Sequence, residues 1–182
     1  MAIAAQNIAL IGFRATGKST VGRLLAAKLE WTLVDMDDEL VAQFGASIHD
    51  WVQKHGWEAF REAEAQLLAE LATGTRQVVA TGGGIVIREE NRSRLRESFF
   101  TVWLQASVGN IETRLAEDPK TASQRPPLTA LALHEEITTI LRERAPWYKE
   151  TADVILPTDT QDLFEIIKNI LTRMDKMDRM GE

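Results

Sequence analysis

A glycine-rich loop lies between an apolar run and a helical pattern near the start of this chain. The loop has glycine, four variable residues, glycine, lysine and serine in the order Gly12-Phe13-Arg14-Ala15-Thr16-Gly17-Lys18-Ser19. Residues 7–12 read as a buried strand, and residues 19–30 repeat apolar side chains at helical spacing. In this context, backbone N–H groups at the N-terminus of the helix bind phosphate. The sequence therefore predicts a nucleotide-binding P-loop.

Each part of the loop has a predicted role. Lys18 would neutralise the β and γ phosphates of a nucleoside triphosphate. The Ser19 hydroxyl would be a ligand of Mg²⁺, because this cation prefers oxygen ligands and keeps several waters. Glycine lets the backbone curl closely around the phosphates. The predicted nucleotide contacts in this segment are Gly12, Ala15, Thr16, Gly17, Lys18, Ser19 and, as an auxiliary donor, Thr20.

Strands and helices alternate along the rest of the chain. Further strands are expected at 31–35, 77–81, 99–105 and 153–156, and helices over 38–72 (with breaks near Gly45 and Gly56), 89–97, 110–117, 131–144 and 161–174. The helix that begins at residue 131 is expected to end before Pro146, and the tail from Asp175 to fray. The alternation predicts one α/β domain over 1–182, with a parallel sheet between layers of helices and ligands at the carboxyl ends of its strands.

The overall composition excludes several kinds of partner and site. With 21 basic and 27 acidic residues the net charge is −6, so we expect no broad attraction to nucleic acid or to anionic membranes. The chain has no cysteine, which excludes disulfides and thiolate metal sites. Its longest apolar run, residues 8–13, is too short to span a bilayer. We expect a cytoplasmic monomer whose partners are small molecules.

Acidic and basic residues after the loop predict a second half of the site. Asp35 and Asp37 lie two apart at the end of a strand, so their carboxylates would face one spot, toward a metal and a substrate hydroxyl. A solvated acidic turn is the alternative. Arg61 and Glu64 lie three apart on a helix and would form an ion pair, an arrangement that is usually surface decoration. Arg144 would end a helix, where cations are common for dipole reasons alone.

Two segments without regular periodicity are further candidates for ligand contact. The triple glycine at 82–84 follows a strand, which indicates that the backbone approaches a ligand closely there. Residues 117–129 are polar and proline-rich and would form a mobile lid, from which Arg125 would stabilise charge on the phosphates. A flexible turn and a solvated loop arginine are the simpler alternatives.

Together these pieces resemble the shikimate kinase family, small relatives of the nucleoside monophosphate kinases within the P-loop superfamily. The resemblance covers nearly the whole chain and rests on Gly12 to Thr20, Val34 to Asp37, Phe60-Arg61 with Glu64, Thr81 to Gly84, Arg125-Pro126, and Glu143 to Pro146 followed by Tyr148. It implies a three-layer P-loop NTPase fold, with a five-stranded parallel sheet of order 2-3-1-4-5 and a lid. It also implies transfer of the γ-phosphoryl group of Mg²⁺-ATP to the 3-hydroxyl of shikimate, a step toward chorismate and the aromatic amino acids.

The resemblance also assigns roles to residues. The helices over 38–72 would bind the substrate, with contacts from Asp37, Arg61, Gly83 and Arg144. The two arginines would clasp the carboxylate, because the guanidinium fork suits that planar group. Asp37 would grip the shikimate hydroxyls, Asp35 would steady the magnesium waters, and Arg125 would reach ATP. The loop at 157–160 would border the adenine.

Three residues depart from the family pattern. Ala15 stands where glycine is frequent, Trp57 where glutamate is usual, and Pro127 where leucine is usual; none of them removes a charged contact.

Two other functions stay open. A related kinase acting on a gluconate-type or nucleotide acceptor would also use two arginines. A non-catalytic shikimate-sensing module would keep the fold without turnover. In the kinase interpretation, the catalytic roles fall to Lys18, Asp37 and Arg125.

Overall fold

The structure is a computed structural model that describes residues 7–117 and 132–180. Its centre is a five-stranded sheet in the order β2-β3-β1-β4-β5, which confirms the predicted order. The strands are β1 (Asn7–Ile11), β2 (Thr32–Asp35), β3 (Gln77–Ala80), β4 (Phe100–Gln105) and β5 (Val154–Pro157). Every pairing is parallel, so all the carboxyl ends meet at one edge of the sheet, where open α/β sheets bind ligands.

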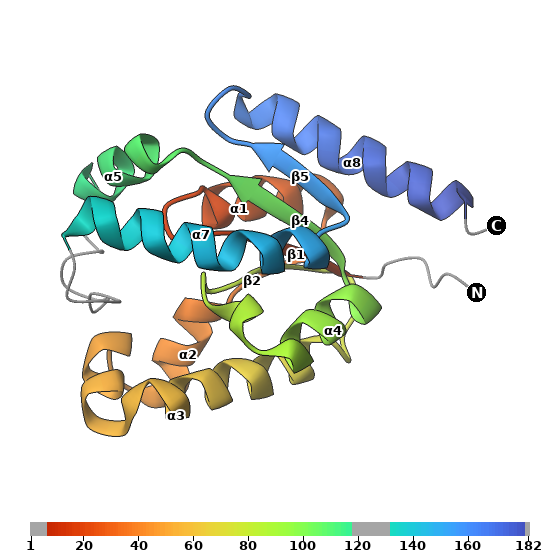
Figure 1. Ribbon diagram of the computed structural model, residues 1–182. Helices are drawn as coiled ribbons and strands as arrows, with labels where there is room; N and C mark the ends of the chain where they lie inside the picture. The colour runs from red at the N-terminus through yellow and green to blue at the C-terminus, as the bar shows by residue number, and fades with distance from the viewer. Residues whose placement is uncertain (1–6, 118–131, 181–182) are drawn as a thin grey trace.

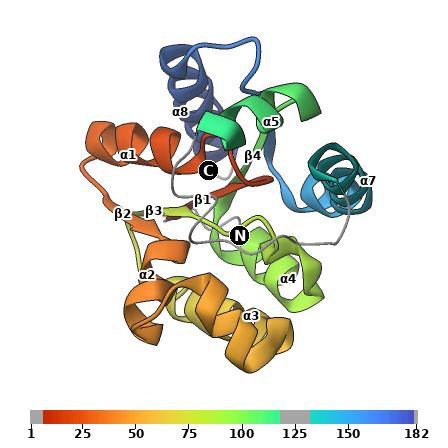
Figure 2. The same cartoon turned by 90° about the vertical axis from the view of Figure 1, so that its left-hand side faces the viewer.

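Helices cover both faces of the sheet, because side chains of a strand alternate between its faces (Figures 1 and 2). Ile8 and Leu10 of β1 enter a core with α1 (Lys18–Leu29) and α8 (Leu163–Met180). Ala9 and Ile11 enter a second core on the opposite face. The elements on that face are α2 (Met36–Phe44), α3 (Ile48–Leu71), the short 3₁₀ helix η1 (Ile85–Ile87), α4 (Glu89–Ser98) and α7 (Leu133–Thr151). The predicted three-layer arrangement is confirmed.

The helical stretch after β2 breaks at both predicted glycines. Gly45 follows α2 with φ 63°. Ser47 caps α3, since its Oγ accepts a hydrogen bond from the N–H of Asp50 at 3.0 Å. Inside α3, Gly56 has φ 84° and ψ 165°, a backbone conformation that favours glycine and kinks the helix. The half of α3 after this kink carries Arg61 and Glu64, which are described below.

Pro146 does not end its helix, so this predicted boundary is wrong. Helix α7 continues through Pro146 to Thr151. Proline in a helix loses one backbone hydrogen bond, but here the helix is anchored on both sides of it. Arg144 and Tyr148 are both buried, and the Tyr148 ring stacks on Trp103 of β4 with 5.4 Å between centroids. Tertiary packing therefore outweighs the local cost of the proline.

The ends of the remaining helices follow from packing as well. Helix α8 runs to Met180 instead of fraying from Asp175, and Met174 is buried in the core that α8 shares with α1. Helix α5 (Val108–Glu117) packs on α7 beside the carboxyl edge of the sheet. Within the described residues, no helix is both long and apolar enough to cross a membrane.

Candidate active site

The loop after β1 is compact and needs its glycines. Gly12 has φ 142°, and a Cβ at this position would overlap with the carbonyl oxygen of Leu104. Gly17 has φ 94° and directly precedes α1, so the loop opens a helix as predicted. Thr16 is buried, and its Oγ1 donates to the carbonyl oxygen of Phe13 at 2.8 Å. Gly12 therefore lets the loop pass close to Leu104, and the hydrogen bond of Thr16 stabilises the loop conformation.

Lys18, the first residue of α1, folds back over this loop. Its Nζ donates to the carbonyl oxygens of Gly12 and Phe13 at 2.9 and 2.7 Å. Only 9% of the residue is exposed. The ammonium group thus lies at a helix N-terminus, where the helix dipole also favours an anion. This arrangement suits the phosphate chain of a nucleotide.

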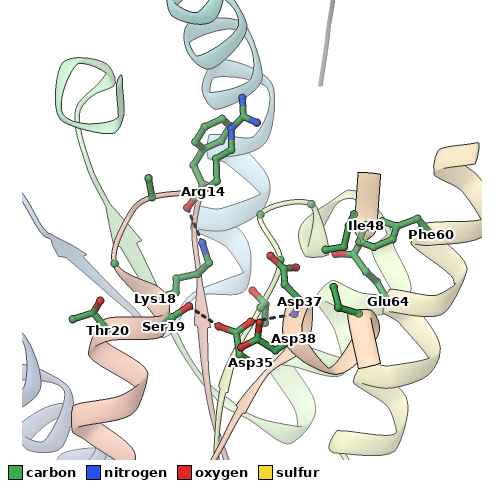
Figure 3. A pocket seen from close by; sticks show the side chains of 18 of the residues that line it. Arg14, Lys18, Ser19, Thr20, Asp35, Asp37, Asp38, Ile48, Phe60 and Glu64 are labelled. Atoms are coloured by element: carbon green, nitrogen blue, oxygen red, sulfur yellow. Dashed lines mark hydrogen bonds between the residues drawn. The ribbon is translucent and has the colours of Figure 1, made fainter. Parts of the chain in front are cut away.

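Ser19 and Asp35 place two oxygen atoms side by side. Ser19 Oγ donates to Asp35 Oδ2 at 2.5 Å, and Asp35 Oδ1 accepts from the N–H of Asp37 at 3.1 Å as the cap of α2. The predicted extended arrangement of the two aspartates is wrong, because β2 ends at Asp35 and Asp37 lies in the first turn of α2. Both still line the same cavity as Ser19 (Figure 3). Since Mg²⁺ prefers hydroxyl and carboxylate oxygens, these residues fit the predicted cation.

A buried ion pair on α3 forms another wall. Arg61 Nη1 donates to Glu64 Oε2, and only 1% of Glu64 is exposed, so this pair is not surface decoration. Burial raises the pKa of the Glu64 carboxyl, and the Arg61 guanidinium opposes that shift. A Cβ on Gly82 would overlap with Glu64 Oε1, and one on Gly84 would overlap with the Arg61 guanidinium. These two glycines make room for the ion pair and also line the cavity, so the close approach of a ligand at 82–84 stays a prediction.

Helix α7 supplies a second guanidinium and fixes the remaining glycine of the triplet. Arg144 Nη1 and Tyr148 Oη donate to the carbonyl oxygen of Gly83 at 3.0 and 2.5 Å. Burial lowers the pKa of Arg144 and raises the pKa of Tyr148 to about 12. Arg144 lies within α7 and not at its end, so the helix dipole does not explain its presence. Arg144 lies between the core and the cavity, which it lines.

These groups line one cavity of about 510 Å³ at the carboxyl edge of the sheet, a volume usual for a small-molecule site (Figure 3). Figure 3 shows Asp37 between the loop that carries Lys18 and the helix that carries Glu64. The predicted site residues that line the cavity are Ala15, Gly17, Lys18, Ser19, Thr20, Asp35, Asp37, Arg61, Gly83 and Arg144. From residue 118 onward, the predicted lid lies outside the residues that the structure describes, and so do Arg125 and Pro127.

The family model for shikimate kinase matches residues 14–175 of the chain. The chain belongs to the shikimate kinase family. The shikimate kinase of Nitratidesulfovibrio vulgaris is 46% identical over 153 residues, which cover 84% of this chain and 87% of that protein. The shikimate kinase of Enterococcus faecalis is 40% identical, with 93% of this chain and 98% of that protein covered. The chain is therefore a phosphotransferase with an alcohol acceptor, as predicted.

Solved structures agree with this family. A shikimate kinase from Acinetobacter baumannii in complex with shikimate has a TM-score of 0.84 at 31% identity, covering 91% of this chain and 90% of that one. A gluconokinase from Sinorhizobium meliloti, at 18% identity and a TM-score of 0.53, shares the fold alone. The chain is thus much more similar to this shikimate kinase than to this gluconokinase.

Two departures from the shikimate kinase pattern have structural consequences. Ala15 has φ 61°, a left-handed conformation that explains why glycine is frequent there in the family. Trp57 lines the cavity with its ring centroid 5.1 Å from Arg61 Cζ, and it meets the Phe60 ring edge-on at 5.8 Å. Trp57 thus supports the Arg61 guanidinium by a cation–π contact, a role that the sequence did not predict.

The sequence also did not indicate a role for Arg114. From α5, its Nη1 donates to the carbonyl oxygen of Ala15 at 3.2 Å and to Thr158 Oγ1 at 3.0 Å. This side chain holds the segment after β5 beside the P-loop, where the adenine border at 157–160 was predicted. Arg114 lies on a short helix, as many solvated arginines do, so the local sequence does not indicate its contacts.

Proposed function

We propose that this enzyme transfers the γ-phosphoryl group of ATP to the 3-hydroxyl of shikimate, giving shikimate 3-phosphate and ADP, with Mg²⁺ as cofactor. One observation carries the proposal: the P-loop shares a single cavity with two largely buried guanidinium groups and with Asp37. The similarity to proteins named shikimate kinase extends over most of their length, and one such protein was solved in complex with shikimate. These relatives support the same acceptor.

The charges of the acceptor wall favour a carboxylate. Glu64 offsets the positive charge of Arg61 through their ion pair, which leaves the positive charge of Arg144 for the acceptor, and Asp37 adds a negative charge to the same cavity. A monoanionic carboxylate balances the charge of Arg144. A phosphate dianion would bring a second negative charge beside Glu64 and Asp37, and repulsion between like charges is costly. This balance favours shikimate over a nucleoside monophosphate.

Catalysis in this site rests on positioning and on charge neutralisation. Lys18 and the loop amides bind the donor phosphates. Asp37 accepts a hydrogen bond from the acceptor hydroxyl and takes its proton as the new phosphorus–oxygen bond forms. Ser19 would hold Mg²⁺ directly and Asp35 through water, and the bound cation supplies charge neutralisation at the phosphates. Arg125 would add a further positive charge from the lid.

We further propose that the enzyme acts as a cytoplasmic monomer with small-molecule partners alone. Residues of a single chain supply both the donor and the acceptor walls. The net charge of −6 gives no broad attraction to nucleic acid. The use of ATP supports a cytoplasmic location. The segment at 157–160, which Arg114 holds beside the loop, would border the adenine.

An ADP-release assay with shikimate, gluconate and nucleoside monophosphates as acceptors tests the proposal. We expect Mg²⁺-dependent turnover with shikimate and background rates with the others. Turnover with another acceptor and none with shikimate would overturn the assignment. Calorimetric binding of ATP and shikimate without ADP release would also contradict it, and would favour the shikimate-sensing alternative.

A further inference from the structure

The P-loop makes an ion pair with α7 that the roles proposed above leave unexplained. Arg14 Nη2 donates to Glu136 Oε1, a contact between residues 122 apart in sequence. The two side chains are only 12% and 3% exposed. Figure 3 shows the Arg14 side chain directed away from Ser19 and Asp35. Because removing one partner from a buried pair is strongly unfavourable, this contact constrains the loop much more than a surface ion pair would.

Apolar contacts tie the same part of the loop to the same turn of α7. The residue before Arg14 packs in a hydrophobic cluster whose buried members are Phe13, Ile111, Leu115, Ile137 and Ile140. Glu136 directly precedes a member of this cluster, and it lies in the first turn of α7. Apolar surroundings lower the local dielectric constant, so the attraction between the two charges is stronger than in water.

The backbone next to Arg14 needs such a restraint. Ala15 adopts φ 61°, which a residue with a Cβ keeps only where the surrounding structure holds it. Carbonyl oxygens on both sides of Arg14 are in use: that of Phe13 accepts from Lys18 Nζ at 2.7 Å, and that of Ala15 accepts from Arg114 at 3.2 Å. A displaced Arg14 would therefore move an oxygen atom that holds the P-loop lysine.

We propose that Glu136 is a positioning residue for ATP binding. Through Arg14 it holds Phe13 to Ala15 in the conformation that presents Lys18 and the loop amides to the phosphates. The inference rests on the proposed function, because it requires ATP to bind at this loop. Arg61 and the other acceptor-wall residues take no part in the ion pair, so shikimate binding should not depend on it.

Glu136→Gln tests this role, since it removes the charge and keeps the size of the side chain. Glu135→Gln removes the same charge from the exposed neighbouring position and is the matched control. For Glu136→Gln we expect the KM for ATP to rise about tenfold, because a charge-assisted hydrogen bond is lost. We expect the KM for shikimate to stay within about twofold. Glu135→Gln should keep both wild-type constants.

A double variant keeps the test decisive if loss of this ion pair prevents Glu136→Gln from folding. Arg14→Met with Glu136→Leu removes both charges, and apolar replacement of a whole buried pair usually preserves the fold. This variant should give the native circular dichroism spectrum and a similar rise in the KM for ATP. A wild-type KM for ATP in either folded variant, or equal rises in both KM values, would overturn the proposal. A wild-type protein without shikimate-dependent ADP release would instead refute the proposed function.

Discussion

Replacing Arg61 with alanine removes one of the two guanidinium groups that we propose bind the acceptor. A hydrogen bond to a charged group contributes about 1.5–3 kcal/mol. Since each 1.4 kcal/mol is a factor of ten in affinity, shikimate should bind roughly 10- to 150-fold more weakly to Arg61→Ala. The P-loop and Asp37 are unchanged, so kcat at saturating shikimate should fall by a smaller factor.

The same change also acts on stability through Glu64. This carboxyl is 1% exposed, and leaving a buried charge without its partner destabilises a fold by about 3–5 kcal/mol. Burial already raises its pKa above the ordinary 4.5, and loss of Arg61 raises it further. A raised pKa means that the folded protein keeps this proton up to a higher pH than the unfolded chain does. The destabilisation is therefore absent below pH 4.5 and grows as the pH rises through the raised pKa.

Two further variants separate binding from folding. Arg61→Ala combined with Glu64→Gln removes the buried charge, so this variant should regain stability in urea unfolding at neutral pH while shikimate binding stays weak. Arg142→Ala, an exposed arginine on α7, is the control for general loss of positive charge. Calorimetric titration with shikimate measures each affinity. Wild-type affinity in the folded double variant would refute the role given to Arg61.

Three other predictions follow from the site. Lys18→Ala should lower kcat in the ADP-release assay by about a thousandfold or more, because it removes the charge beside the phosphates; a loss below tenfold would contradict its role. Tyr148 is the single tyrosine of the chain, so absorbance titration of its phenolate should give a pKa of about 12, whereas a midpoint at 10.0 would contradict its burial. Because its folded pKa is raised, its stabilising effect is complete below pH 10 and is lost as the pH rises to about 12. Gly84→Ala should weaken shikimate binding at least about tenfold by displacing Arg61, while Gly109→Ala, where a Cβ meets nothing within 4 Å, should bind shikimate normally.

The sequence predicted the sheet and the P-loop because both depend on local patterns. Short apolar runs mark the strands, and the loop motif carries its lysine and serine at fixed spacing. Asp35 and Asp37 were placed correctly at the cavity for an incorrect reason, since a helix begins where an extended segment was expected. The helix end predicted at Pro146 was wrong, because burial of the neighbouring side chains stabilises the helix on both sides of the proline.

What the sequence could not predict depends on contacts between distant segments. The need for glycine at 84 follows from the Arg61 guanidinium on another element. Arg114 and the pair formed by Arg14 and Glu136 look like solvated charges when only their own helix or loop is considered. Their roles become visible when the fold brings α5 and α7 against the P-loop.

We propose that one cavity holds ATP at the P-loop and shikimate between Arg61 and Arg144. Phosphorus NMR of a reaction containing enzyme, Mg²⁺-ATP and shikimate tests this proposal. The predicted result is a new phosphomonoester signal coupled to the proton at C3 of shikimate, formed in equal amount with ADP. Phosphate on a different hydroxyl, or ADP formed without any shikimate phosphate, would contradict the claim.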